Sequence, residues 1–257
     1  MSSFLMRAAL ACAAVLALPG SLYAKDRIPA YIAAAVADSA RPDADRQRDS
    51  NRKPAETLAF AGVKPGNQVV ELVPGGGYYT RLLSKVVGPR GKVYAVMPAP
   101  RSDAPKDAPD RTAAVRAIAA DPNYSNVTVL VQPVKQLSLP TRADLVWTSQ
   151  NYHDIHNVPQ IDLLAFNKSM ADALKSGGTY LVIDHAAASD APADVTSTLH
   201  RINPDVVKQE VQAAGFKLTA ESVLLKNPDD DHKANVFDAA IRGKTDQFML
   251  KFRKAAK

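Results

Sequence analysis

The residues of this chain best suited to chemistry lie in three short polar segments, each directly after an apolar run. The first, ELVPGGGYYT, sets Glu71 four positions ahead of three consecutive glycines. Glycine permits positive φ angles and close approach of a ligand to the backbone, and a following helix would direct its amide groups to the same place. Glu71 could accept a hydrogen bond from a ligand ammonium group or order the turn. The segment matches neither the dinucleotide fingerprint G-x-G-x-x-G nor the phosphate loop.

The second segment is SQNYHDIHN, residues 149–157. The imidazole of His153 ordinarily titrates near neutrality, so His153 could take a proton from a substrate hydroxyl or amine while Asp154 orients its ring. We therefore predict His153 and Asp154 as catalytic residues. In the alternative, Asp154 or Asn157 caps the following helix, and the histidines lie at the surface or at a hinge.

The third segment begins with Asp184-His185, which could join His153 and Asp154 in a cluster of carboxylates and imidazoles. Magnesium prefers oxygen ligands, and a set rich in imidazole suits zinc or another transition metal better. The spacing of these residues is not diagnostic of a metal site. The sequence therefore predicts a polar rim without a bound metal.

Two other charged segments could either have a functional role or simply lie at the solvent-exposed surface. Arg201 could pair with an acidic substrate or with Asp184, or it could be a surface charge. The run DDDH at 229–232 is expected to be a solvated turn, because a calcium loop needs alternating ligands and a glycine.

Strand-like and helix-like segments alternate along most of the chain. The predicted strands are 68–73, 92–97, 127–131, 144–149, 179–184 and 216–225, and a terminal hairpin is predicted from 236–242 and 247–253. The predicted helices are 31–36, 54–63, 79–87, 110–120, 160–174 and 204–214. Such alternation produces parallel βαβ units with helices on both faces of the sheet, and ligands then bind beyond the carboxyl ends of the strands. The three polar segments are therefore expected on one rim.

The arrangement of Glu71, Gly75 and Gly77 between a first strand and a first helix resembles the first motif of the class I S-adenosylmethionine-dependent methyltransferases. The resemblance covers roughly residues 51–254 and includes the entry helix and turn in PAETLAFAGVKPGNQVVELV. The GGGYYT turn, the NYHD segment and the closing DQFMLKFRK also look like those of a group of secreted, predicted methyltransferases.

This resemblance implies an α/β, Rossmann-like methyltransferase fold, with a mostly parallel seven-stranded sheet, helices on both faces and an antiparallel C-terminal hairpin. It implies S-adenosylmethionine as the cofactor and a methyl acceptor, a small molecule or another partner, that the sequence does not identify. The cofactor-binding residues it implies are Glu71, Gly75, Gly76, Gly77 and Asn151. Two positions depart from the family pattern. Val73 replaces the usual first glycine, and Met97 stands where an acidic residue ordinarily binds the ribose hydroxyls.

The first 24 residues have the composition of a bacterial-type signal peptide. Arg7 precedes an apolar run over 8–18, and Ala24 gives a cleavage point before Lys25. The run is too short to span a bilayer comfortably, although an uncleaved anchor is the alternative. We expect a signal peptide at 1–24, an N-terminal extension at 25–53, a methyltransferase-like domain at 54–257, and a periplasmic or secreted location.

The charge and cysteine content of the chain indicate which kinds of partner and which cross-links to expect. Cys12 is the only cysteine and would leave with the signal peptide, so no disulfide is expected. Without residues 1–24 the chain has 31 basic and 26 acidic residues, a net charge of +5, and the basic residues are scattered. We therefore expect no nucleic-acid partner and, after cleavage, no stable membrane span.

Two functions are consistent with the sequence. The first is transfer of a methyl group from S-adenosylmethionine to an unidentified acceptor. The second is an exported protein of the same fold that binds a ligand without transferring a methyl group. Met97 and the signal peptide motivate the second function, because S-adenosylmethionine is made in the cytoplasm.

Overall fold

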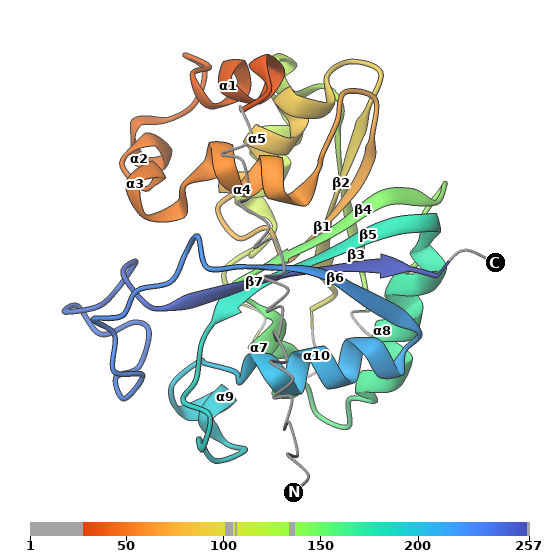
Figure 1. Cartoon of the computed structure of the whole chain (residues 1–257). Coiled ribbons are helices and arrows are strands. Elements are labelled where there is room, and N and C mark those ends of the chain that lie inside the picture. The colour runs from red at the N-terminus through yellow and green to blue at the C-terminus, as the bar shows by residue number, and fades with distance from the viewer. Residues whose placement is uncertain (1–27, 101–104, 106, 134–136, 256–257) are drawn as a thin grey trace, which may run out of the picture.

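A seven-stranded sheet forms the centre of the protein in a computed structural model that describes residues 28–255 except 101–104, 106 and 134–136 (Figure 1). The strand order is β3-β2-β1-β4-β5-β7-β6. The strands are β1 Gln68–Leu72, β2 Lys92–Pro98, β3 Val127–Gln132, β4 Ala143–Ser149, β5 Leu174–His185, β6 Phe216–Ser222 and β7 Gln247–Lys254. Strands β1 to β5 are parallel, and β7 pairs antiparallel with both β5 and β6. The predicted fold class, with its antiparallel C-terminal end, is confirmed.

Helices cover both faces of this sheet. The helices are α1 Ala30–Val36, α2 Asp43–Arg46, α3 Asp49–Arg52, α4 Pro54–Ala61, α5 Tyr78–Val87, α6 Ala113–Ala120, α7 Tyr152–His156, α8 Leu163–Ala173, α9 Val195–Thr198 and α10 Pro204–Ala213. Figure 1 shows α1, α4 and α5 on one face and α7, α8 and α10 on the other. The side chains of consecutive strand residues point to opposite faces of the sheet. In β1, Val69 joins the core under α5, whereas Val70 joins the core over α8.

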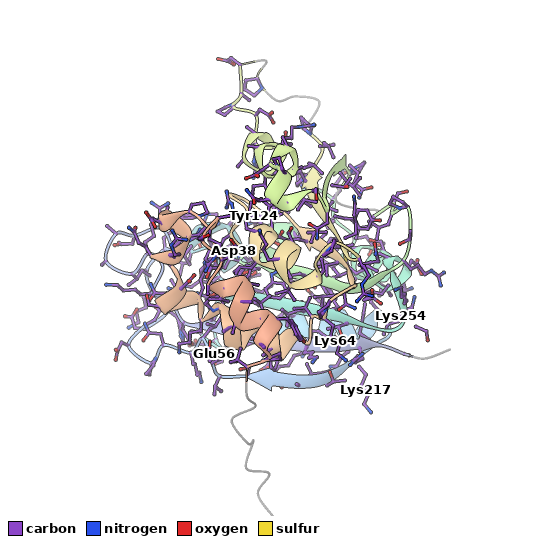
Figure 2. The ribbon with its side chains drawn as sticks, turned by 90° about the horizontal axis from the view of Figure 1, so that it is seen from above. Asp38, Glu56, Lys64, Tyr124, Lys217 and Lys254 are labelled. Atoms are coloured by element: carbon purple, nitrogen blue, oxygen red, sulfur yellow. The ribbon has the colours of Figure 1, made fainter. Side chains whose placement is uncertain are left out.

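The segment 30–52, part of the predicted N-terminal extension, packs onto the domain through helices α1 to α3. Arg41 is fully buried and donates to both carboxylate oxygens of Asp49, at 2.9 and 2.6 Å. The Tyr78 hydroxyl of α5 also donates to Asp49, at 2.6 Å. In the view of Figure 2, Asp38 and Tyr124 lie close together where this segment meets the domain, and the Tyr124 hydroxyl donates to the carbonyl of Ala40 at 3.3 Å.

Two of the predicted boundaries are wrong. Residues 236–242 form no strand, so the antiparallel pair is β6 with β7, joined by the long connection 223–246. The side chains of Asn235 and Asp238 accept from the backbone N–H groups of Phe237 and Ala240, and such local bonds favour turns over strands. Residues 174–178, placed between the predicted helix and strand or at the helix end, instead begin β5, since the backbone is already extended at Leu174.

None of the helices among the described residues has the length and apolar character needed to cross a membrane. The predicted signal peptide, residues 1–24, lies outside the described part of the chain.

Candidate functional site

Two neighbouring cavities lie at the carboxyl ends of the central strands. The first, of about 230 Å³, is lined by Arg48, Arg52, Glu71, Leu72, Val73, Pro74, Gly75, Gly76, Tyr78, Tyr79, Ser149, Gln150, Asn151 and Asp154. The second, of about 500 Å³, is lined by Gln47, Arg48, Asn51, Arg52, Gln150, His185, Val236, Phe237, Arg242, Gly243 and Gln247. Their shared walls are Arg48, Arg52 and Gln150, so the cavities are adjacent. The predicted rim is therefore hollowed where β1, β4 and β5 end.

The turn after β1 has the backbone of a glycine turn although it begins with valine. Val73 has a φ of 47°, in the left-handed region that disfavours β-branched residues. Asn151 holds this turn, because its side-chain amide donates to the carbonyls of Leu72 and Val73 at 3.1 and 3.3 Å. The hydroxyl of Thr148 donates to the carboxamide oxygen of Asn151. Asn151, a cofactor-binding residue implied by the family resemblance, lines the first cavity, but its amide donates to the turn.

The three glycines of this turn have different surroundings. A Cβ atom on Gly77 would lie 2.1 Å from Cδ1 of Ile118, and the φ of Gly77 is +80°, so glycine is required there to let α5 pack on α6. Gly75 and Gly76 line the first cavity, and a Cβ atom on either would meet no atom of the described residues within 4 Å. The open space beside Gly75 and Gly76 is therefore available to a ligand.

Glu71 is buried at the end of β1 and accepts a 2.6 Å hydrogen bond from the hydroxyl of Thr80. Burial raises the pKa of Glu71 to about 7, against the opposing effects of the Thr80 hydrogen bond and of the charges of Arg52 and Arg81. Near neutral pH this carboxyl is thus poised between its neutral and charged forms. A cationic ligand group in the first cavity would favour the charged form.

We expect the stability of the unliganded protein to depend on this carboxyl. Since folding favours the neutral form, the contribution of Glu71 is fully present below a pH of about 4.5 and is lost as pH rises through about 7, by on the order of 3 kcal/mol. The free energy of unfolding of Glu71→Gln, measured with urea, should therefore rise relative to that of the wild type between pH 5 and pH 8. Parallel pH profiles for the two proteins would contradict this prediction.

Arg52 is a site residue that the sequence interpretation missed. Its guanidinium lies over the rings of Tyr78 and Tyr79, at 4.8 and 5.4 Å from the ring centroids. It also donates to the side-chain oxygen of Gln150, whose amide donates to Gln247 at 3.1 Å. Gln150 has a φ of 60°, an uncommon conformation for a residue with a side chain. The charge-rich character of 41–53 was the available signal, but only the fold brings that segment to the cavities.

His153 is oriented by Asp184 and not, as predicted, by Asp154. Nδ1 of His153 lies 2.8 Å from Oδ1 of Asp184, and the backbone N–H of His153 donates to Oδ2 at 2.8 Å. Burial would lower the pKa of His153, but the charge of Asp184 and its hydrogen bond outweigh burial and raise that pKa. His153 is buried and lines neither of the two cavities. Its predicted role as a base in contact with substrate therefore has no geometric support in these cavities.

The other nitrogen of His153 faces two further polar groups. Nε2 of His153 lies 3.4 Å from Oδ1 of Asp154, and Nδ1 of His200 lies 3.5 Å from the same oxygen. Potential ligand atoms of these three residues all lie within 4.8 Å of one another. The sequence placed His153 and Asp154 together but gave no reason to add His200, which lies 46 positions after Asp154.

His185 is the imidazole that reaches the second cavity. Its Nδ1 lies 2.7 Å from the hydroxyl of Thr245, and burial lowers the pKa of His185 to about 4. The ring is therefore neutral at neutral pH and can exchange a hydrogen bond with a ligand, although it is a weak base.

Arg201 meets one residue of the acidic run at 229–232, Asp230, in the interior. Both side chains of the Arg201–Asp230 pair are almost completely buried, and the guanidinium donates to the two carboxylate oxygens at 2.9 and 3.0 Å. Arg201 is thus not a surface charge, because Asp230 pairs with it. In the run expected as a solvated turn, Asp229 and Asp231 are exposed and Asp230 is buried. The pair fixes the connection between β6 and β7, which supplies Val236, Phe237 and Arg242 to the second cavity.

Comparison with solved structures identifies the fold. A SAM-dependent methyltransferase from Aquifex aeolicus matches with a TM-score of 0.55 at 19% sequence identity, over 83% of this chain and 98% of that one. The glycopeptide N-methyltransferase MtfA in complex with S-adenosylmethionine matches at 0.52 and 19%, over 79% and 87%. Aeropyrum pernix fibrillarin, with natively bound S-adenosylmethionine, matches at 0.50 and 17%, over 80% and 76%. No family model and no curated protein sequence matches the chain. The chain therefore has the fold of the class I methyltransferases.

Proposed function

We propose that this protein is an S-adenosylmethionine-dependent methyltransferase and that the donor binds in the first cavity. The observation that carries the proposal is the open glycine turn at Gly75 and Gly76, set against buried Glu71 at the end of β1. This turn lies in a sheet whose strand order is that of the methyltransferase fold, at the position where such sheets bind ligands. Structures of the same fold contain S-adenosylmethionine, and one contains sinefungin.

The charges around the first cavity suit such a donor. S-adenosylmethionine carries an ammonium group, a carboxylate and a cationic sulfonium, which supplies an electrophilic methyl group. Glu71 and Asp154 offer carboxylates to the cationic groups, and Arg48 and Arg52 offer guanidinium groups to the carboxylate. The family's usual acidic partner for the ribose is absent from β2, where Met97 is buried. We therefore expect donor affinity at the weak end of the family range.

The acceptor is proposed to bind in the second cavity and to be anionic. Three arginines, Arg48, Arg52 and Arg242, line that cavity, and none of the described residues lining it is acidic. Guanidinium groups bind carboxylates and phosphates through paired hydrogen bonds. The arginines would orient the acceptor next to the first cavity, and methyl transfer depends chiefly on such in-line positioning. His185, a neutral imidazole and a weak base, lines the same cavity and can exchange a hydrogen bond with the acceptor.

Calorimetry tests the donor site directly. Titration of the purified protein with S-adenosylmethionine and with S-adenosylhomocysteine should give heat and a stoichiometry of one per chain. Absence of heat at millimolar ligand would overturn the proposal. The alternative function, ligand binding without transfer, predicts binding of the donor but no labelled product from any acceptor.

The charge of the acceptor gives a prediction for Arg242. With 4-hydroxybenzoate and its uncharged amide as matched probes, we expect methyl transfer or binding to favour the carboxylate. Arg242→Ala should reduce that preference by about tenfold, or 1.4 kcal/mol. Lys244→Ala is the matched control, because Lys244 is exposed on the same connection and does not line the cavity. Equal preference in wild type and Arg242→Ala would contradict an anionic acceptor held by this arginine.

We also propose export to the periplasm or beyond, on the basis of the residue pattern in 1–24. Fusion of residues 1–30 to a reporter that is active only in the periplasm tests this. A cytoplasmic signal would overturn it, and would also remove the difficulty of cofactor supply.

A further inference from the structure

The cluster of His153, Asp154 and His200 has unusual spacing. The two imidazole nitrogens lie 3.4 and 3.5 Å from one carboxylate oxygen, which is long for a hydrogen bond. Ligand atoms around a tetrahedral zinc ion lie roughly 3.3 to 3.5 Å apart, because each is about 2.0 to 2.1 Å from the metal. These two distances match the edges of such a tetrahedron, and all three candidate ligand atoms lie within 4.8 Å of one another.

The contacts between Asp184 and His153 are also those expected for a metal-bound histidine. Asp184, fully buried, contacts Nδ1 of His153 at 2.8 Å and fixes the ring through the backbone N–H as well. When Nδ1 carries the proton, the lone pair of Nε2 is directed at the cluster. A carboxylate on the far nitrogen is the usual partner of a metal-bound histidine, since it fixes the tautomer and raises the basicity of the ligand nitrogen.

His200 contributes an independent observation. Its Nδ1 is shielded from solvent and makes no hydrogen bond within the described part of the chain. The residue also adopts a φ of 55°, in the left-handed region, and its ring packs edge-on against Phe237 with centroids 4.9 Å apart. A strained backbone and an unsatisfied ring nitrogen aimed at a carboxylate are explained together if the nitrogen binds an ion.

We propose that Nε2 of His153, a carboxylate oxygen of Asp154 and Nδ1 of His200 bind one divalent transition-metal ion, of which zinc is the best match. Two imidazoles and one carboxylate suit zinc and disfavour magnesium, which prefers oxygen ligands. Three protein ligands leave a fourth position open, as in catalytic zinc sites. Because Asp154 also lines the first cavity, the metal would lie at the wall of that cavity. This site replaces the metal-free rim expected from the sequence.

Zinc binding can be measured without any methyl acceptor or donor. Protein stripped with a chelator and titrated with Zn²⁺ by calorimetry should bind one ion per chain, and Zn²⁺ should raise the unfolding temperature. Co²⁺ in place of Zn²⁺ should give the intense visible absorption of a tetrahedral site. Failure of donor binding would leave this proposal intact, so the two proposals fail separately.

Variants identify the ligands. Asp154 and His200 are partly exposed, so Asp154→Asn and His200→Ala are expected to fold. Each should weaken zinc binding by at least about tenfold. A loss of that size is typical even when the mutated residue only hydrogen-bonds to a metal ligand. His232→Ala is the matched control, because His232 is bonded to Asp246 outside the cluster. Absence of zinc binding by the wild type, or equal binding by wild type and His200→Ala, would overturn the proposal and leave an ion cluster without metal.

Discussion

Replacing Gly76 with valine is expected to abolish binding of S-adenosylmethionine while leaving the fold intact. Gly76 lines the first cavity, and a Cβ atom there would lie more than 4 Å from every atom in the described part of the chain that could block it. Its φ lies outside the left-handed region, so a side chain introduces no backbone strain of that kind. The valine would thus occupy the space proposed for the donor. We expect affinity to fall by at least about 100-fold, or 2.7 kcal/mol, in the calorimetric titration.

A graded series separates steric blocking from misfolding. Gly76→Ala should weaken binding less than Gly76→Val, and both should unfold at the wild-type temperature without ligand. Gly77→Ala provides the contrast, since its Cβ would collide with Ile118 and its φ is +80°, so it should lower stability by roughly 2 to 4 kcal/mol. Unchanged donor affinity in Gly76→Val would place the donor elsewhere.

Replacing Asp230 with alanine is expected to cause the largest loss of stability of any single change discussed for this protein. Arg201 is fully buried, and its charge would lose both carboxylate bonds. Asp230 also accepts from the backbone N–H groups of Asp246 and His232, at 2.6 and 3.1 Å. An uncompensated buried charge typically costs about 3 to 5 kcal/mol, which corresponds to a decrease of roughly 10 °C in unfolding temperature for a chain of this size.

Asp231→Ala is the control for this change, because it is the same substitution at the next position, where the side chain is 66% exposed. The free energies of unfolding of the two variants, measured with urea, should differ by several kcal/mol. Arg201→Met combined with Asp230→Leu should recover part of the loss, since no buried charge then remains unpaired. Equal stability of Asp230→Ala and Asp231→Ala would show that water or a local shift compensates Arg201.

The local patterns of the sequence correctly predicted the five parallel strands β1 to β5. The apolar run at 68–72 is buried on both faces of the sheet, as a central parallel strand must be, and the glycines after it give the turn into α5. Because the carboxyl ends of parallel strands meet on one edge, the segments after β1, β4 and β5 were expected together, and they are. The pattern in 236–242 was misleading, since alternation of apolar and polar residues also occurs in a turn held by Asn235 and Asp238.

The sequence by itself determined the parallel strands, the rim on which polar residues gather, and the glycine turn, because these depend on periodicity and on the topology of parallel sheets. Only the tertiary structure decided which partner each polar side chain has. It pairs His153 with Asp184, places His200 beside Asp154, and buries Arg201 with Asp230. These pairs join residues 29 to 46 positions apart, and the paths of the connecting loops bring them together. Those paths depend on packing and buried charge, which no local pattern encodes.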